Sequence, residues 1–172
     1  MVQRPRLAAL TALIPFAVII WSHTASWPFG SLTDTYVPQG PTDTFSDFSP
    51  SDRTGVLTTR GRPITGSPVY LLFQPRRHSK KIRVEIFAAP SSLLAATDLK
   101  IGYRHGSGPE GNIFVRTEIE KKDDGIILWA VVPFDEMTRE RTDARRIVFE
   151  APRASTSTPI FIQRVNFFYV DN

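Results

Sequence analysis

The stretch Lys81–Ala88, KIRVEIFA, alternates apolar residues at positions 82, 84 and 86 with charged residues at positions 81, 83 and 85. Because successive side chains of a strand point to opposite faces of a sheet, this pattern predicts a half-buried β-strand. Residues 113–119 repeat the alternation, and residues 121–125 (KKDDG) are a hairpin signal that follows them. Further strands are predicted at residues 69–74, 99–103, 126–132, 146–150 and 160–170.

Helix signals are weak after the N-terminus. Residues 91–97 (SSLLAAT) predict two helical turns capped by Ser91 or Ser92, and residues 134–145 predict either a short surface helix or a long loop. Roughly seven or eight short strands with few helices favour an all-β domain over residues 56–172. We expect an antiparallel β-sandwich, jelly-roll or immunoglobulin-like, preceded by one N-terminal hydrophobic helix.

The N-terminus predicts a signal anchor or a signal peptide over residues 1–27. Arg4 and Arg6 precede 15 uncharged residues, 7–21, and a helix extended to Trp27 is long enough to cross a bilayer. Trp21 and Trp27 would then lie near the membrane interface. Small residues at positions 22–26 leave cleavage open. In both cases the positive residues predict an extracytoplasmic domain, at the periplasm or the cell surface, which is secreted after cleavage.

Residues 28–55 differ in composition from the predicted domain. Twenty of these 28 residues are Pro, Gly, Ser, Thr or Asp, which predicts an extended linker. Three aromatic residues, Tyr36, Phe45 and Phe48, are exceptions. They indicate docking of the linker, either onto its own domain or onto a partner.

The composition and the polar motifs exclude several chemistries. The chain has 172 residues, 41% of them hydrophobic, and no cysteine, which excludes a disulfide scaffold and a cysteine nucleophile. The three histidines lack the spacing of a zinc site, and no Gly-x-Ser-x-Gly motif occurs. The carboxylates of residues 118–120 and 135–143 are interpreted as solvated surface, with a rim Ca²⁺ site as an alternative. We therefore expect no catalytic residue, no metal and no cofactor.

The densest charge lies in one turn between two predicted strands. The net charge of the whole chain is +4, and the turn would attract phosphate-bearing glycans, other anionic polymers or acidic lipid headgroups. Nucleic acid is not expected, because the domain is predicted to lie outside the cytoplasm and no exposed aromatics accompany the turn. An ordinary solubilising turn is the alternative. The basic residues are Arg76, Arg77, His78, Lys80 and Lys81.

Three aromatic residues on the predicted strands have different expected roles. Trp129 lies within an apolar run and is predicted to be buried in the core. Phe87 and Phe114 fall on the more polar faces of their strands, which indicates either a sugar-stacking patch or packing.

The order of these segments resembles membrane-anchored extracytoplasmic β-sandwich proteins of bacteria. The resemblance covers residues 62–170 and is carried by ITGSPVYLLF, KIRVEIF, LKIGY and RIVFEAP…IFIQRVNFFYV. The closing piece is similar to the last two strands of galactose-binding-like jelly rolls. The resemblance implies a binding or structural module and brings no catalytic residue with it.

The sequence therefore predicts a membrane-anchored, non-catalytic binding module for an envelope glycan or another anionic polymer. A structural subunit of a cell-envelope or surface assembly is the alternative. The expected partners are the membrane and either other envelope proteins or the polymer, and both homo- and hetero-oligomers are left open.

Overall fold

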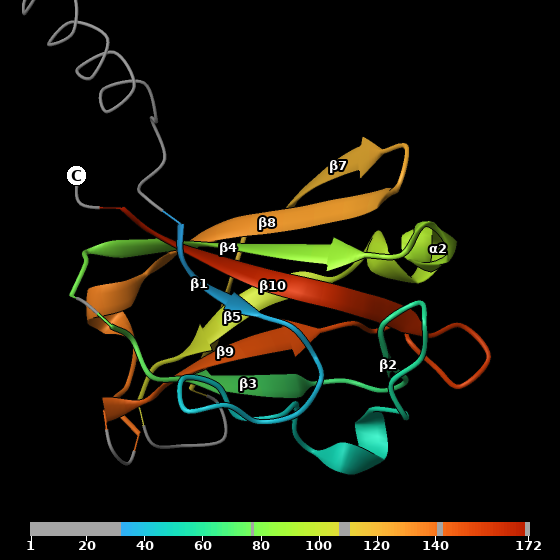
Figure 1. The fold of residues 1–172 in the computed structure, drawn as a ribbon. Helices are drawn as coiled ribbons and strands as arrows, with labels where there is room; N and C mark the ends of the chain where they lie inside the picture. Colours follow the sequence, from blue (N-terminus) through green and yellow to red (C-terminus); the bar gives the residue numbers. More distant parts are fainter. Residues whose placement is uncertain (1–31, 77, 107–110, 141–142, 171–172) are drawn as a thin grey trace, which may run out of the picture.

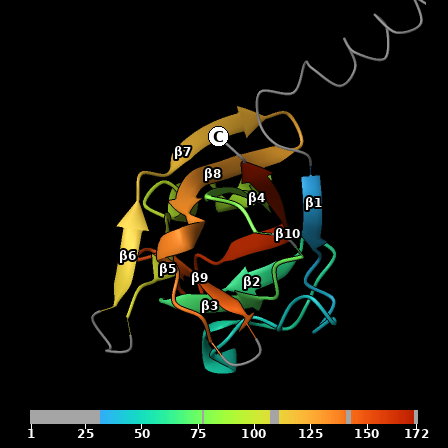
Figure 2. The same cartoon turned by 90° about the vertical axis from the view of Figure 1, so that its left-hand side faces the viewer.

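The computed structural model describes residues 32–76, 78–106, 111–140 and 143–170. These residues form two antiparallel sheets that pack face to face as a sandwich (Figures 1 and 2). The expected membrane residues Arg4, Arg6, Trp21 and Trp27 lie outside the described residues. Among the helices in the described ranges, none has the length and apolar character needed to cross a membrane.

The larger sheet has the strand order β1-β10-β4-β8-β7, and β2 pairs with β10. Its strands are β1 (Leu32–Tyr36), β2 (Arg62–Ile64), β4 (Lys81–Ala88), β7 (Glu118–Lys122), β8 (Gly125–Pro133) and β10 (Ile160–Val170). The smaller sheet has the order β3-β9-β5-β6. Its strands are β3 (Val69–Phe73), β5 (Lys100–Arg104), β6 (Asn112–Val115) and β9 (Arg145–Glu150).

The strand order is jelly-roll-like. Without β2 and β7, the two sheets have the orders β1-β10-β4-β8 and β3-β9-β5-β6. The chain crosses between the sheets at most connections, so β1 and β10, at opposite ends of the described chain, lie side by side. Such crossing connections are those of a double-sheet jelly roll. Of the two predicted sandwich types, the strand order therefore follows the jelly roll.

The core lies between the sheets, where the predicted alternation of β4 is confirmed. Ile82, Val84 and Ile86 are fully buried, and the hairpin over residues 121–125 joins β7 to β8. The single strand predicted for residues 113–119 is wrong, because β6 and β7 belong to different sheets. The chain crosses at Arg116 and Thr117, and the Thr117 hydroxyl accepts the Ile101 N–H at 3.0 Å.

The outer face of the larger sheet corrects the expectation for Trp129. Strand β8 alternates instead of being buried on both faces, and Trp129 faces outward. The Arg83 guanidinium covers its ring, with 4.1 Å between the Cζ atom and the ring centroid. Phe87 is covered in the same way by Arg164 at 3.7 Å. Cation–π contacts thus cover these rings on the outer face of the larger sheet.

The expected helical turns after β4 are present. A 3-10 turn, η2 (Pro90–Ser92), continues into α2 (Leu93–Ala96). Neither expected serine caps the helix with its side chain. The Ser92 hydroxyl instead accepts the Phe161 N–H at 2.9 Å, which fixes the turn to β10. In the charged segment after β8, residues 134–136 form the 3-10 turn η3 (Phe134–Glu136), and residues 137–140 are irregular.

The predicted linker of residues 28–55 is wrong from residue 32 onward. Strand β1 pairs with β10, and η1 (Ser51–Arg53) follows it. Tyr36, Phe45 and Phe48 are 1%, 5% and 4% exposed, with 5.2 Å between the Tyr36 and Phe48 ring centroids. These rings are core residues of their own domain and not partner contacts. Burial of these three rings stabilises the packed conformation of the segment, although its composition is typical of a linker.

Candidate anion-binding site

The turn between β3 and β4 crosses from the smaller to the larger sheet at one end of the sandwich (Figure 1). It is held by backbone and hydroxyl contacts. The hydroxyl of the buried Ser79 lies 2.6 Å from the carbonyl oxygen of Val170, and the Phe134 N–H donates to the Lys80 carbonyl at 2.9 Å. These contacts fix the basic turn against the end of β10 and the start of η3.

The structure joins part of this turn to a second basic segment around a cavity of about 230 Å³. Two of the predicted residues, Arg76 and His78, line it, together with three residues of the segment that precedes β9 and opens that strand. Three guanidinium groups and one carboxylate give the lining a net charge of +2 with histidine neutral. We call this cavity the basic pocket; its lining is Gln74, Pro75, Arg76, His78, Arg139, Asp143 and Arg145.

Arg145 is the most unusual of these residues. It is 4% exposed, and its Nη1 atom donates to the backbone carbonyl of Asp143 at 2.9 Å. In the described part of the chain, its Nε atom is buried without a hydrogen-bond partner, and its guanidinium lies 5.1 Å from the Phe134 ring centroid. Burial and the nearby positive charge of Arg139 lower the pKa of Arg145, which Asp143 opposes. A buried charge of this kind is stabilised by an anionic partner.

Arg76 is held in place by a buried carboxylate. Its Nε atom lies 3.1 Å from Asp34 Oδ1, and its Nη2 atom donates to the Thr44 hydroxyl at 3.3 Å. The second oxygen of Asp34 accepts the Tyr169 hydroxyl at 3.0 Å. The Arg76 side chain is still 69% exposed. Its guanidinium is therefore accessible from solvent while the pair with Asp34 fixes its position.

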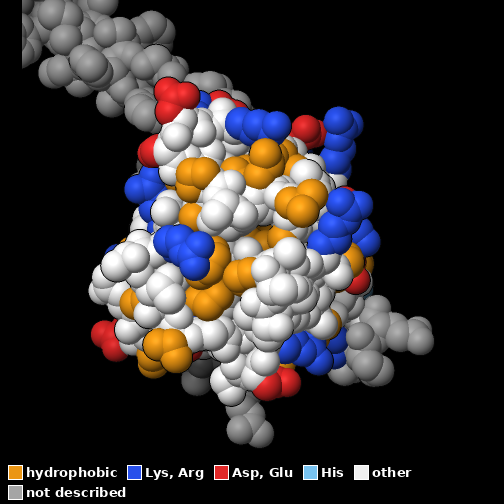
Figure 3. Space-filling view, turned by 90° about the vertical axis from the view of Figure 1, so that its right-hand side faces the viewer, with side chains coloured by type: hydrophobic (Ala, Val, Ile, Leu, Met, Phe, Trp, Pro, Cys, Tyr) orange, Lys and Arg blue, Asp and Glu red, His pale blue; other side chains and the backbone are white. Residues whose placement is uncertain are grey.

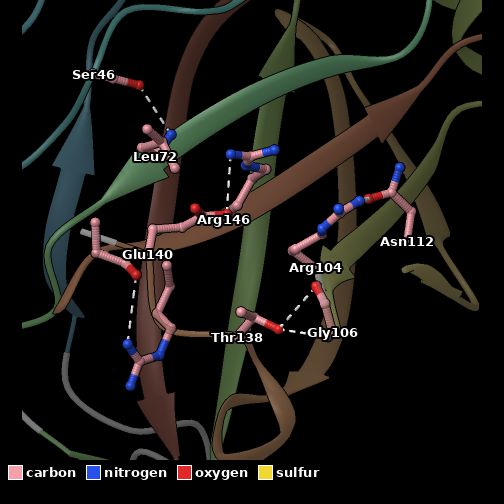
Figure 4. A network of polar contacts seen from close by, with 10 residues as sticks. Ser46, Leu72, Arg104, Gly106, Asn112, Thr138, Glu140 and Arg146 are labelled. Carbon is pink, nitrogen blue, oxygen red and sulfur yellow. Dashed lines mark hydrogen bonds and ion pairs between the residues drawn. The ribbon is translucent and has the colours of Figure 1, made fainter. Parts of the chain in front are cut away.

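The segment that carries Arg139 is fixed by contacts drawn in Figure 4. Glu140 pairs with Arg146 of β9 at 3.0 Å, and the Gly106 N–H donates to the Thr138 hydroxyl at 2.6 Å. Asp143 has a φ of 63°, a left-handed conformation that Asp tolerates better than most residues. Arg139 and Asp143 approach to 3.8 Å on the surface, a weak pair.

The phenol of Tyr103 supports the same end of the molecule. Its hydroxyl donates to Glu136 of η3 at 2.7 Å. Burial, then the hydrogen bond to Glu136 and the charge of that carboxylate, raise the pKa of Tyr103 to about 12. The phenol therefore stays protonated at neutral pH and holds η3 beside β5.

The other basic residues of the turn lie apart from the basic pocket. Lys80 and Lys81 are exposed and do not line it, and Arg77 is outside the described residues. Sequence reasoning missed Arg139, Asp143 and Arg145, which it took as a salt-bridged surface. One signal was present for Arg145, because strand alternation places it on the same face as the buried Ile147 and Phe149.

The remaining candidates show no site geometry. In the part of the chain that the structure describes, no group of three or more His, Asp or Glu side chains lies together as a metal site would require. Glu118 pairs with Arg116 at 2.7 Å, and Glu120 pairs with Lys122, all on the solvent-exposed surface. Phe114 has the ammonium group of Lys100 5.8 Å from its ring centroid.

Comparison with known proteins gives a fold-level similarity. No family model and no curated protein matches the sequence. The chain is similar in structure to the XRCC1 N-terminal domain, a jelly-roll β-sandwich, in an X-ray crystal structure of reduced XRCC1 bound to the DNA polymerase β catalytic domain. The TM-score is 0.40 at 14% sequence identity, over 83% of this chain and 99% of that chain.

Proposed function

We propose that this protein is a non-catalytic binding module whose basic pocket takes an anionic group of an envelope glycan or of another anionic polymer. The observation that carries this proposal is Arg145, a buried guanidinium whose Nε atom has no hydrogen-bond partner among the described residues, in a pocket with two further arginines. A phosphate, sulfate or carboxylate entering the pocket would compensate that charge. Lys80 and Lys81 would add long-range attraction from outside the pocket.

The proposal includes delivery of the domain across a membrane by residues 1–27. Its support is the sequence, in which Arg4 and Arg6 precede an uncharged apolar run. Protease treatment of intact cells that make a C-terminally tagged chain should remove the tag, and N-terminal sequencing should show whether residue 1 is retained. A tag that stays protected until the cells are lysed would contradict the extracytoplasmic location.

Binding to dextran sulfate, with unsubstituted dextran as the uncharged control, tests the basic pocket. Arg145→Gln should weaken binding by about tenfold or more, because a charged hydrogen-bond partner is lost. Arg139→Gln should weaken it by about threefold. Lys80→Gln is the matched control, since it removes one charge from the basic turn between β3 and β4, outside the pocket, and it should cost less than about twofold.

Equal losses for Arg139→Gln and Lys80→Gln would show that the polymer senses only overall charge and would contradict the pocket. Thermal denaturation of each variant separates loss of binding from loss of folding, which matters for the buried Arg145. If duplex DNA binds more tightly than dextran sulfate at equal salt and with the same dependence on Arg145, the polymer class in the proposal is wrong.

The alternative function, a structural subunit of an envelope assembly, rests on the edge of the larger sheet. Strand β7 ends the strand order and presents its backbone toward solvent. However, its residues are mostly charged, with Glu118, Glu120, Lys121 and Lys122 among its five positions. Charges on an edge strand hinder edge-to-edge association, so this observation favours the binding module.

A further inference from the structure

At the end opposite the basic pocket, α2 carries an exposed leucine. Strand β4 runs from the basic turn at Lys81 to Ala88, and η2 and α2 follow it (Figure 1). Ala95 and Ala96 face the core at 3% and 0% exposure, whereas Leu94 is 68% exposed. The hydrogen bond from the Phe161 N–H to Ser92 fixes this turn, so Leu94 projects from a rigid base.

Leu94 is a ridge between two hollows. On one side lies a hollow of about 640 Å³ lined by Ser91, Leu93, Leu94, Thr97, Ile119 and Lys121. On the other side lies a hollow of about 350 Å³, which Leu94 and Ser91 share with Ala95, Phe161 and residues 156–159. A single exposed leucine is common on protein surfaces. A leucine between two hollows differs because a ligand can contact it on both sides.

The charged side chains that line the two hollows are both basic. Among the residues that the structure describes, Lys121 is the one charged residue that lines the larger hollow, and Arg60 is the one that lines the smaller hollow. The Arg60 guanidinium lies 4.0 Å from the Phe161 ring centroid, which holds it at the rim. Figure 3 shows this face, with hydrophobic side chains toward its centre and both basic and acidic side chains toward its edges.

We propose that this α2 surface, the two hollows and the Leu94 ridge, docks a segment of a partner protein that is both apolar and acidic. One apolar side chain of the segment enters each hollow, and carboxylates face Arg60 and Lys121. The complementary signs give orientation and the apolar contact gives affinity. This inference is independent of the basic pocket, which lies at the other end of the sandwich.

A phage-displayed random peptide library panned against the full-length chain tests the α2 surface. We expect enrichment of peptides that have two apolar residues with Asp or Glu on either side. A synthetic peptide of the enriched class should lose about tenfold in affinity for Leu94→Asp, as expected for a central contact residue. Lys121→Glu and Arg60→Glu should each weaken binding about threefold, and replacing the facing peptide acid with lysine should restore it.

Ile113→Asp is the matched control, since Ile113 is 40% exposed on β6 and lines neither hollow. It should leave the peptide affinity unchanged. Enriched peptides without an acidic excess, or peptides that bind Leu94→Asp as well as the unchanged chain, would overturn the proposal. So would a Leu94-dependent dimer in sedimentation, or Leu94-dependent binding to phosphatidylglycerol vesicles without peptide enrichment, since these would identify another occupant.

Discussion

The two ends of this sandwich differ in how they present charge. At the basic end, arginines of residues 74–80 and 134–145 surround a pocket, and carboxylates such as Asp34 and Glu140 hold the surrounding chain. At the α2 end, residues 89–99 and 151–159 are mostly Ala, Ser, Thr, Leu and Pro, and an apolar ridge meets solvent. The same strands thus support an electrostatic site at one end and an apolar one at the other. The difference lies in the loops.

The largest expected effect concerns the part of the basic end that the composition assigned to a linker. Phe45→Ala should lower the free energy of unfolding by about 3–5 kcal/mol, because a 5% exposed ring is removed from the core. Urea denaturation measures this change. Val37→Ala, at a position that is 44% exposed, should change stability by less than about 0.5 kcal/mol. If both substitutions left the free energy of unfolding unchanged, residues 32–48 would not be packed against the core at the basic end.

Alkaline pH should weaken the basic end through Tyr103. Its pKa is about 12 in the folded chain, against about 10 when unfolded, so the folded state holds the proton longer. The stability is therefore complete below pH 10 and falls by about 2 kcal/mol as pH rises through 12. Denaturation at several pH values should show a smaller fall for Tyr103→Phe.

Part of the loss of stability at alkaline pH should remain in Tyr103→Phe. Burial, and then the hydrogen bond to Asp47, also raise the pKa of Tyr36, so its phenol contributes in the same direction. Equal pH slopes for the unchanged chain and Tyr103→Phe would mean that the Tyr103–Glu136 contact does not support the basic end.

Salt should separate the two ends in binding. Raising the ionic strength from about 0.1 M to about 1 M shortens the Debye length from about 10 Å to about 3 Å. Dextran sulfate binding at the basic pocket should then weaken by about tenfold, and peptide binding at the α2 surface by less than about threefold. Titration of dextran sulfate and of the peptide at the two salt concentrations measures both affinities. Equal losses of affinity would contradict the difference between the two ends.

The smallest effect is expected on the smaller sheet, where β5 begins and β9 ends next to the α2 end. Lys100 pairs with Glu150 at 2.9 Å while its side chain is 55% exposed. Lys100→Gln should change the free energy of unfolding by less than about 0.5 kcal/mol, as exposed pairs contribute little. It should also leave both binding reactions unchanged. A loss of dextran sulfate binding would show that the anionic polymer extends beyond the basic pocket.

Strands with a clear period were predictable from the sequence, and strand β1 was not. The alternation of β4 and the KKDDG turn are local signals, and both are present as expected. Strand β1 consists of LTDTY, whose polar residues fit a linker as well as a strand. Its conformation is set by pairing with β10, more than a hundred residues away, which local patterns do not report.

The candidate site also has a part that could be predicted from the sequence and a part that could not. A cluster such as Arg76, His78 and Lys80 is visible in the sequence because its members are adjacent. The pocket was not visible, because its second half comes from Arg139 and Arg145, brought there by the crossing from β8 to β9. Trp129 was misplaced because an apolar run does not tell which of its residues an arginine will cover.

Because β1 begins at residue 32, the segment that connects it to the proposed anchor is short. From the end of the proposed anchor at residue 27 to the start of β1 at residue 32 there are five residue-to-residue steps, roughly 17 Å at full extension. Asp34, two residues into β1, already touches Arg76 of the basic pocket. A chain held in this way would rest its cationic end against the lipid headgroups and turn the Leu94 ridge outward, toward proteins that approach from beyond the bilayer.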